Sequence, residues 1–169
     1  MILSPIAGIN RITQKFGLRP EVYAQFGLKG HNGIDFTGRF KKQMATIYAP
    51  IEGVVTVVQD DGKAGYGKHI KIRTVAPDAK GRIKEVVLAH LSEFTVKKGQ
   101  FVYQLDPIGV QGNTGFSTAP HLHFGLRFID AKTNAVLDYG NGFKGYVDFL
   151  PHLRFWALPD GKEAYAIVV

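Results

Sequence analysis

The stretch APHLHFGLRF at residues 119–128 places two histidines one residue apart among large apolar side chains. In a β-strand, the side chains at positions i and i+2 point to the same face. His121 and His123 would then lie side by side, while Leu122 and Phe124 face the opposite side and enter a core. Two imidazoles on one face can share a metal, divide metal binding from proton transfer, or simply line a solvated strand.

Three other segments have alternating or β-branched residues, and with 121–129 they are the strands that the sequence predicts. They are residues 47–59, 68–76 and 83–91. Gly, Asp, Asn and Pro residues separate these segments, and no long stretch has helical periodicity. The sequence therefore predicts a mostly β protein with an antiparallel β-sheet core. Residues 151–169 follow as an extension that is too short for a second domain.

The composition is that of one folded domain, since 169 residues with 45% hydrophobic content allow a sizeable core. The chain has no cysteine, which excludes disulfides, zinc–thiolate sites and thiol nucleophiles. A metal site would have to use His, Asp or Glu. The formal net charge of +7 suits a polyanionic partner such as nucleic acid, anionic lipid or an anionic cell wall. Because the basic residues are scattered along the chain, we expect no specific nucleic-acid binding.

The N-terminal sequence predicts neither a signal peptide nor a membrane anchor. Its apolar residues are interrupted by Pro5, Gly8 and Asn10, and no basic region precedes them. No window approaches the roughly 20 apolar residues of a membrane span. We therefore expect a soluble protein. A target outside the membrane would require release by lysis, transport in a virion or removal of a leader.

The segment GHNGIDF at residues 30–36 adds two candidate metal ligands. In extended geometry His31 and Asp35 face one side, and Gly33 leaves the space between them open. Imidazole nitrogen and carboxylate oxygen both bind zinc, at about 2.0–2.2 Å. The alternative is a turn in which the Asp35 side chain caps backbone amides.

His90 ends an apolar segment in VVLAHLSEF, residues 86–94. It is either a histidine at the edge of the core that bonds a carbonyl group or a proton carrier where a cleft opens. Together the candidate residues suffice for three protein ligands with a fourth position left for water, which is the arrangement of catalytic zinc sites. The HExxH motif of the helical zinc proteases is absent, so histidine would have to move the protons. His69 and His152 carry no functional expectation.

These motifs resemble those of the lysostaphin-like, LytM-type zinc metalloendopeptidases, which cut peptidoglycan cross-bridges and stem peptides. The similarity runs from about residue 8 to about residue 150. The matching stretches are RITQKFGLRP (11–20), HNGIDF (31–36), IYAPIEGVV (47–55), GYGKHIKI (65–72), LAHLSEFTVKKGQFV (88–102) and IGVQGNTGFSTAPHLHFGLR (108–127). The resemblance implies an antiparallel β-sheet core with a groove above it, walled by loops.

Transferred residue by residue, the resemblance implies one Zn²⁺ per chain, bound by His31, Asp35 and His123. It also implies that His90 and His121 are the two catalytic histidines. The activity implied is hydrolysis of peptide bonds in peptidoglycan, on the extracellular or periplasmic side of the membrane. Residues 1–150 would form the catalytic domain and residues 151–169 an extension packed on it, with Phe155 and Trp156 in a final strand. We expect a monomer.

Three segments, residues 36–50, 74–87 and 128–153, are longer or more charged than is usual in this family. We expect them to affect substrate specificity, Gly–Gly against D-Ala–diamino acid bonds, rather than the chemistry. The polar loop at residues 112–120 is expected to shape the groove before His121. The alternative function is that of a non-catalytic relative that binds the wall or regulates other hydrolases. Such relatives typically lack one or more of the zinc residues.

Overall fold

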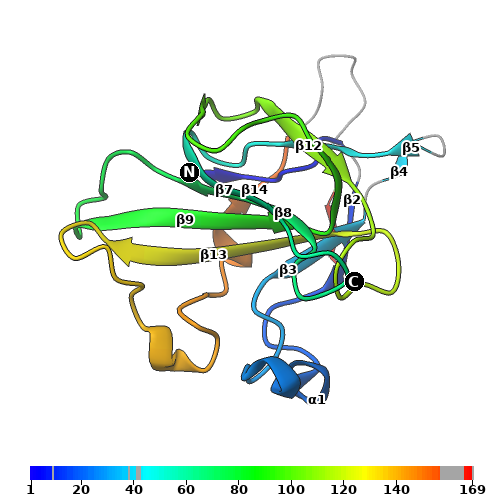
Figure 1. Cartoon of the computed structure of the whole chain (residues 1–169), viewed down its shortest axis with the longest axis horizontal. Helices are drawn as coiled ribbons and strands as arrows, with labels where there is room; N and C mark the ends of the chain where they lie inside the picture. Colours follow the sequence, from blue (N-terminus) through cyan, green and yellow to red (C-terminus); the bar gives the residue numbers. More distant parts are fainter. Residues whose placement is uncertain (9, 38, 41–42, 157–165, 169) are drawn as a thin grey trace.

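The computed structural model of the chain describes residues 1–8, 10–37, 39–40, 43–156 and 166–168. Strands dominate these residues, and the helical elements are short (Figure 1). The helical elements are α1 (Pro20–Tyr23) and the 3₁₀ turns η1 (Ala24–Phe26), η2 (Tyr139–Asn141) and η3 (Leu150–His152). In the described part of the chain, no helix has the length and apolar character needed to cross a bilayer.

The main sheet contains eight strands of the described residues, in the order β11, β7, β8, β9, β13, β3, β2 and β15. Their bounds are Phe101–Val102 (β11), Gly53–Asp60 (β7), Lys68–Arg73 (β8), Arg82–Ala89 (β9), Leu122–Asp130 (β13), Ile34–Thr37 (β3), Asn10–Gln14 (β2) and Ala166–Val168 (β15). Neighbours pair antiparallel except β15, which runs parallel to β2. The mostly β fold with an antiparallel sheet core is therefore confirmed.

Smaller sheets surround this one. A three-stranded antiparallel sheet has the order β10, β12, β6, while β1 pairs parallel with β14 and β4 pairs antiparallel with β5. The bounds are Leu91–Phe94 (β10), Pro107–Gln111 (β12), Thr46–Tyr48 (β6), Ile2–Leu3 (β1), Leu153–Arg154 (β14), Arg39–Phe40 (β4) and Gln43–Met44 (β5).

Two of the predicted strands are each divided in the structure. The segment 47–59 contains β6 and β7, which belong to different sheets and are separated by the turn that contains Pro50. Proline has no backbone donor for a sheet ladder, so the chain leaves one sheet there and enters the other. The segment 83–91 divides at His90, whose φ of 64° turns the chain from β9 into β10. The strands predicted at 68–76 and 121–129 are β8 and β13, with shifted ends.

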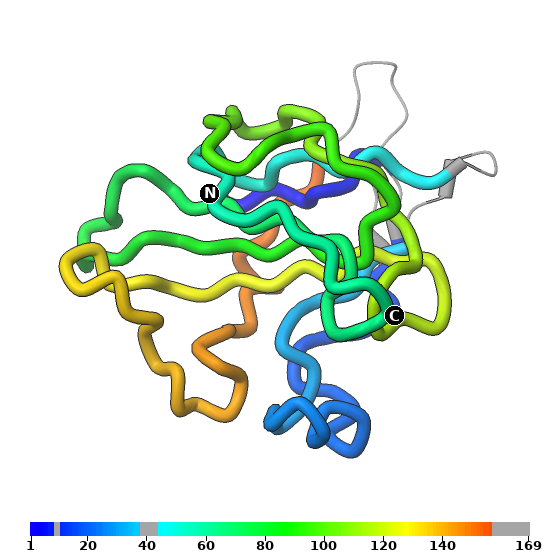
Figure 2. The backbone as a smooth tube through the Cα atoms, in the orientation of Figure 1, coloured from blue at the N-terminus to red at the C-terminus, as the bar shows by residue number. Residues whose placement is uncertain are grey.

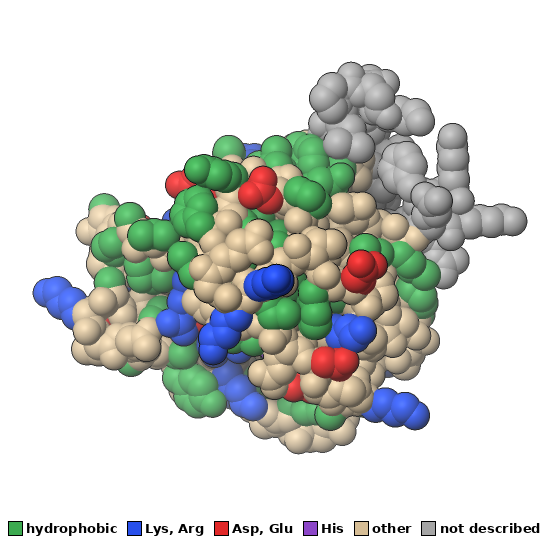
Figure 3. Space-filling model, turned by 45° about the horizontal axis from the view of Figure 1, so that its top comes forward, with side chains coloured by type: hydrophobic (Ala, Val, Ile, Leu, Met, Phe, Trp, Pro, Cys, Tyr) green, Lys and Arg blue, Asp and Glu red, His purple; other side chains and the backbone are tan. Residues whose placement is uncertain are grey.

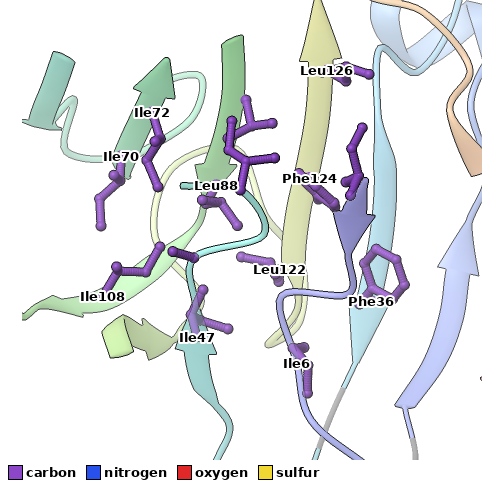
Figure 4. Close-up of a cluster of buried hydrophobic side chains, with 14 of the residues drawn as sticks. Ile6, Phe36, Ile47, Ile70, Ile72, Leu88, Ile108, Leu122, Phe124 and Leu126 are labelled. Atoms are coloured by element: carbon purple, nitrogen blue, oxygen red, sulfur yellow. The ribbon is translucent and has the colours of Figure 1, made fainter. Parts of the chain in front are cut away.

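One face of the main sheet forms the hydrophobic core. Side chains from its central strands and from the three-stranded sheet point into the same space between the two sheets (Figure 4). The fully buried ones include Ile34, Phe36, Ile47, Ile70, Ile72, Leu88, Ile108, Leu122 and Phe124. Each contributes about 1.5–3 kcal/mol by its removal from water. The alternation predicted for Leu122 and Phe124 is therefore confirmed.

The opposite face of the main sheet carries the candidate site residues together with a small apolar cluster of Val87, Ala89 and Tyr146. In Figure 1, α1 and the segment 131–146 extend below the main sheet, whereas β12 lies above it. The backbone tube in Figure 2 shows the same separation. Lys and Arg side chains occur at many points of the surface in Figure 3, with Asp and Glu side chains between several of them. The structure thus has one apolar core face and a second face that carries the candidate residues and is partly covered by the segment 131–146.

Residues 151–156 pack against the N-terminal segment. Strand β14 pairs with β1, and the Trp156 indole donates a hydrogen bond of 2.8 Å to the Ser4 carbonyl oxygen. The Trp156 ring also contacts the Tyr48 ring, with 5.1 Å between centroids, and Phe155 packs on the core. The strand in this stretch lies just before the two aromatic residues, at Leu153–Arg154. Residues 157–165 and 169 lie outside the described residues.

Candidate metal centre and groove

Three side chains meet on the polar face of the main sheet. His123 of β13 pairs in register with Asp35 of β3, and His31 lies just before β3. His31 Nε2 lies 2.9 Å from His123 Nδ1 and 3.0 Å from Asp35 Oδ1. His123 Nδ1 lies 3.2 Å from the same carboxylate oxygen. All three residues are buried, so the three donor atoms form a compact triangle away from bulk water.

Gly33 makes room for the third member of this triangle. A β-carbon at position 33 would lie 2.6 Å from His123 Cε1 and 2.6 Å from the Phe124 carbonyl oxygen. The space expected to stay open between His31 and Asp35 is therefore occupied by the His123 ring. His123 Nε2 is buried and has no hydrogen-bond partner in the described part of the chain. Packing against Gly33, with the Nδ1 contacts to His31 and Asp35, thus fixes this ring.

Hydrogen bonds and burial set the protonation of the triangle. The Nδ1–H of His31 donates to the Lys15 carbonyl oxygen at 3.1 Å, which leaves the Nε2 lone pair directed at the other two residues. Burial lowers the pKa of His123 to about 4 despite its hydrogen bond to Asp35. Burial by itself would raise the pKa of Asp35, but hydrogen bonds from His123 and His31 outweigh it and hold this pKa well below its ordinary value.

The donor set fits a divalent metal ion. It presents one carboxylate and two imidazole nitrogens, and these are ligands that zinc accepts. His31 Nε2 and His123 Nδ1 lie 2.9 Å apart, and a bound cation would accept the lone pairs of both. Donor atoms 2.9–3.2 Å apart can all lie about 2.0–2.2 Å from one centre. Three protein ligands leave a fourth tetrahedral position, and Asp35 and His123 both line a groove.

His90 and His121 lie beside the triangle and line the same groove. Their ring centroids are 4.6 Å apart, and the His90 ring is 6.0 Å from that of His123. The Nδ1–H of His90 donates to the Thr114 carbonyl at 2.7 Å, and that of His121 donates to the Ala119 carbonyl at 2.8 Å. With Nδ1 bonded, Nε2 is the ring atom of each that can accept or return a proton, and His121 Nε2 lies 3.6 Å from Asp35 Oδ2. The structure therefore brings together all five residues singled out in the sequence.

The backbone holds His90 in a left-handed conformation, with φ of 64°. Its amide donates to the Tyr66 carbonyl oxygen at 3.0 Å, which fixes this turn at the end of β9. Such a conformation costs about 1–3 kcal/mol in a non-glycine residue and is typical of functional sites. Burial, with His123 and His121 close by, lowers the pKa of His90 to about 3. The imidazole is therefore neutral at pH 7.

The groove over the polar face has a volume of about 560 Å³. Its walls come from three segments: Arg19, Val22, Tyr23 and Phe26 near α1; Phe116, Ser117 and Thr118 in the loop 112–120; and Tyr139, Lys144 and Tyr146 in 131–146. The loop 112–120 thus shapes the groove before His121, as expected. Of the three unusual segments, only 128–153 contributes lining residues among those that the structure describes.

Several polar residues of the site were not singled out in the sequence. Asn32 donates from Nδ2 to the Tyr66 hydroxyl at 2.9 Å, and Gln14 donates to the Tyr23 hydroxyl at 2.6 Å. Burial and the nearby Asp35 raise the pKa of Tyr23 to about 12, so its hydroxyl stays protonated. No spacing in the sequence indicates these contacts, because they join segments through the fold. Tyr103 is exposed, contacts the edge of the Phe101 ring and does not line the groove.

The other two histidines lie outside the triangle. His69 is buried, with Nδ1 donating to the Gly67 carbonyl oxygen at 2.9 Å, so an exposed position is excluded for it. His152 is exposed in η3. Neither residue lines the groove.

Comparison with known proteins identifies the family. Residues 29–136, which include all five residues, match Peptidase family M23. The chain belongs to peptidase family M23. It is 35% identical over 126 residues to the DD-carboxypeptidase/endopeptidase Mpg of Neisseria meningitidis, covering 75% of this chain and 26% of the relative. It is 29% identical over 131 residues to lysostaphin of Staphylococcus simulans, covering 76% of this chain and 24% of lysostaphin. The M23 chain thus spans about a quarter of the length of these relatives.

Solved structures of M23 peptidases share the fold. The catalytic domain of lysostaphin from Staphylococcus simulans has a TM-score of 0.54 at 27% identity, covering 73% of this chain and 79% of that one. The catalytic domain of the prophage-encoded M23 protein EnpA from Enterococcus faecalis has a TM-score of 0.57 at 26% identity, covering 86% of this chain and 89% of that one. The resemblance to lysostaphin-like peptidases is therefore confirmed.

Proposed function

We propose that this M23 chain is a zinc-dependent endopeptidase that hydrolyses peptide bonds in peptidoglycan cross-links or stem peptides. The observation that carries the proposal is the donor triangle of His31, Asp35 and His123 at a groove, beside two histidines whose Nδ1 atoms bond backbone carbonyls. The peptidoglycan substrate is supported by relatives such as lysostaphin and the peptidoglycan DD-endopeptidase ShyA of Vibrio cholerae, which is 34% identical over 106 residues.

In this proposal His31 Nε2, Asp35 Oδ1 and His123 Nδ1 hold the zinc ion. When bound, zinc polarises a carbonyl group and lowers the pKa of a water molecule to about 7. One of His90 and His121 accepts a proton at Nε2 from the attacking water. The histidine that took up the proton then donates a hydrogen bond to the developing oxyanion and returns its proton to the leaving amine. The Nδ1 hydrogen bonds of His90 and His121 to backbone carbonyls keep both rings oriented during these transfers.

We further propose that residues 1–150 form the catalytic domain and that 151–169 are an extension packed on it. The packing of Trp156 on Ser4 and Tyr48 supports this division. The proposed site of action is the cell wall, on the extracellular or periplasmic side, with the chain acting as a monomer. All five site residues are present, so the non-catalytic alternative has no supporting observation.

The test is the loss of turbidity of purified peptidoglycan sacculi, with zinc content measured by elemental analysis on the same preparations. We expect wild type to clear sacculi with about one zinc per chain and His123→Ala to lose both properties. His152→Ala, which changes an exposed histidine, serves as the matched control and should keep both. Zinc binding without clearing of any wall type would contradict the substrate, and absence of both in wild type would favour a binding module.

A further inference from the structure

A row of charged residues crosses the polar face of the main sheet beyond the metal centre. Arg73 of β8, Glu85 of β9 and Arg127 of β13 are paired directly in register. Arg73 Nε lies 2.5 Å from one Glu85 oxygen, and Arg127 Nη2 lies 2.6 Å from the other. Glu85 is buried, and its single negative charge serves two guanidinium groups. The row therefore has one positive charge in excess.

Lys71 adds to this excess. It lies on β8 two residues before Arg73, so both side chains project from the same face of the sheet, and it lines the groove. Among the described residues, no acidic group forms an ion pair with it. Burial lowers the pKa of the Lys71 ammonium group, although Glu85 opposes this. A half-buried ammonium without an anionic partner is costly, and an anion in the groove would remove that cost.

The lining of the groove as a whole is cationic. It contains Arg19, Lys71, Arg127 and Lys144, whereas Asp35 is the one acidic lining residue in the described part of the chain. Because Asp35 belongs to the metal centre, it does not neutralise the distant lysines. Lys144 comes from the wall segment 131–146. The sheet and the wall thus both present positive charge to a ligand in the groove.

The register places Lys71 within reach of a bound peptide. Lys71 pairs with Val87, which pairs with Gly125, two residues along β13 from His123. Two residues of strand and two strand spacings separate Lys71 and His123 by about 12 Å between Cα atoms. An extended peptide covers about 3.3 Å per residue, so this distance corresponds to three or four residues. A charged group that far from the scissile bond can reach Lys71.

We propose that Lys71 and Arg127, with Lys144 on the adjacent wall, form a carboxylate-binding subsite of the groove. The chain then prefers peptides that carry a carboxylate near the scissile bond over neutral peptides. Stem peptides with an acidic or diamino-acid residue carry such a group, whereas a bridge made of glycine alone has no side-chain carboxylate. The inference rests on the proposed peptidase function and names its substrate class.

The test compares three cross-linked disaccharide peptides. The first has a free side-chain carboxylate, the second has that carboxylate amidated, and the third has only its C-terminal carboxylate amidated. A lost charge-assisted hydrogen bond corresponds to a decrease of about 10-fold or more in kcat/KM. We expect wild type to show such a decrease for one of the two amides, mostly through KM. The amide that is affected identifies whether the side-chain or the terminal carboxylate binds.

Variants then assign the preference to the subsite. Lys71→Met should bring the ratio of kcat/KM for acid over amide close to one, while Lys71→Arg should keep the preference. Lys80→Met removes the same charge from an exposed position in the β8–β9 hairpin and should leave the ratio unchanged. Equal cleavage of acid and amides by wild type overturns the subsite, as does an unchanged ratio in Lys71→Met.

Calorimetric binding of the uncleaved peptides to metal-free wild-type protein separates the subsite from the proposed reaction. Tighter binding of the acid than of its amide supports the subsite even in a preparation that cleaves no peptide. Equal binding of acid and amide overturns it, whatever the activity.

Discussion

His31 Nε2 lies 2.9 Å from His123 Nδ1, although the two residues are 92 positions apart in the sequence. The antiparallel pairing of β13 with β3 places His123 opposite Asp35, and His31 reaches back over the start of β3. A cation bound there would accept the lone pairs of both imidazole nitrogens beside the carboxylate. The proposed zinc site is therefore a property of one strand pair and the turn before it.

Asp35→Asn should abolish zinc binding. The substitution removes the one anionic donor of the triangle. Loss of a residue that only supports a ligand lowers metal affinity by about 10–100-fold, and we expect a larger decrease here because a ligand itself is lost. Elemental analysis after dialysis against defined zinc concentrations measures the effect. Asp148→Asn, at an exposed position, should bind zinc as wild type does. Retention of one zinc per chain by Asp35→Asn would exclude Asp35 as a ligand.

His121→Ala should separate metal binding from activity. His121 Nε2 lies 3.6 Å from Asp35 Oδ2, outside the triangle of donors, so zinc content should stay close to that of wild type. Loss of a proton-transfer group should lower kcat by about 10²–10⁴-fold. The measurement is release of soluble fragments from sacculi, with His31→Ala as the comparison that loses zinc and activity together. A fully active His121→Ala protein would be incompatible with the proposed role.

Gly33→Ala should damage the metal centre without changing any ligand. The added methyl group would lie 2.6 Å from His123 Cε1 and 2.6 Å from a backbone oxygen, so the imidazole has to move. We expect weaker zinc binding and reduced activity. Gly140→Ala is the matched control, since its β-carbon meets nothing within 4 Å and its φ is not in the left-handed region. Wild-type zinc affinity in Gly33→Ala would show that the ring position is not critical.

Glu85→Gln should destabilise the protein and change its response to acid. Burial would raise the pKa of Glu85, but Arg127 and Arg73 outweigh it and lower this pKa below the ordinary value of 4.5. Because folding lowers the pKa of Glu85, its carboxylate stabilises the folded protein above pH 4.5. This stabilisation is lost as the pH falls through the pKa that Glu85 has in the folded state. Removing the buried charge leaves two guanidinium groups unpaired and should cost about 3–5 kcal/mol at neutral pH.

Urea unfolding of wild type and Glu85→Gln between neutral pH and pH 3 measures both effects. The loss of stability below pH 4.5 should be smaller in the variant than in wild type. Glu21→Gln, which removes an exposed pair with Arg19 at 3.7 Å, should behave like wild type. The proposed role of the Glu85 carboxylate would be wrong if Glu85→Gln and wild type lost stability in parallel over this pH range.

The sequence by itself determined the fold class and singled out the five residues that the fold brings together. Alternation in HLHFGLRF separates the core side chains Leu122 and Phe124 from His121 and His123, because side chains alternate between the faces of a strand. It did not locate the break at Pro50 or the left-handed turn at His90. Both depend on which sheet receives the next strand, and that is decided by long-range pairing.

Tertiary structure alone decided which groups surround the five residues. Tyr23, Asn32 and Lys71 come to the groove from three separate segments, and no local pattern links them. The charge row of Arg73, Glu85 and Arg127 exists only because three strands pair in one register. A strand's own residues fix which side chains share a face, whereas the neighbours of that face are fixed by sheet order and register. These are set by packing of the whole core.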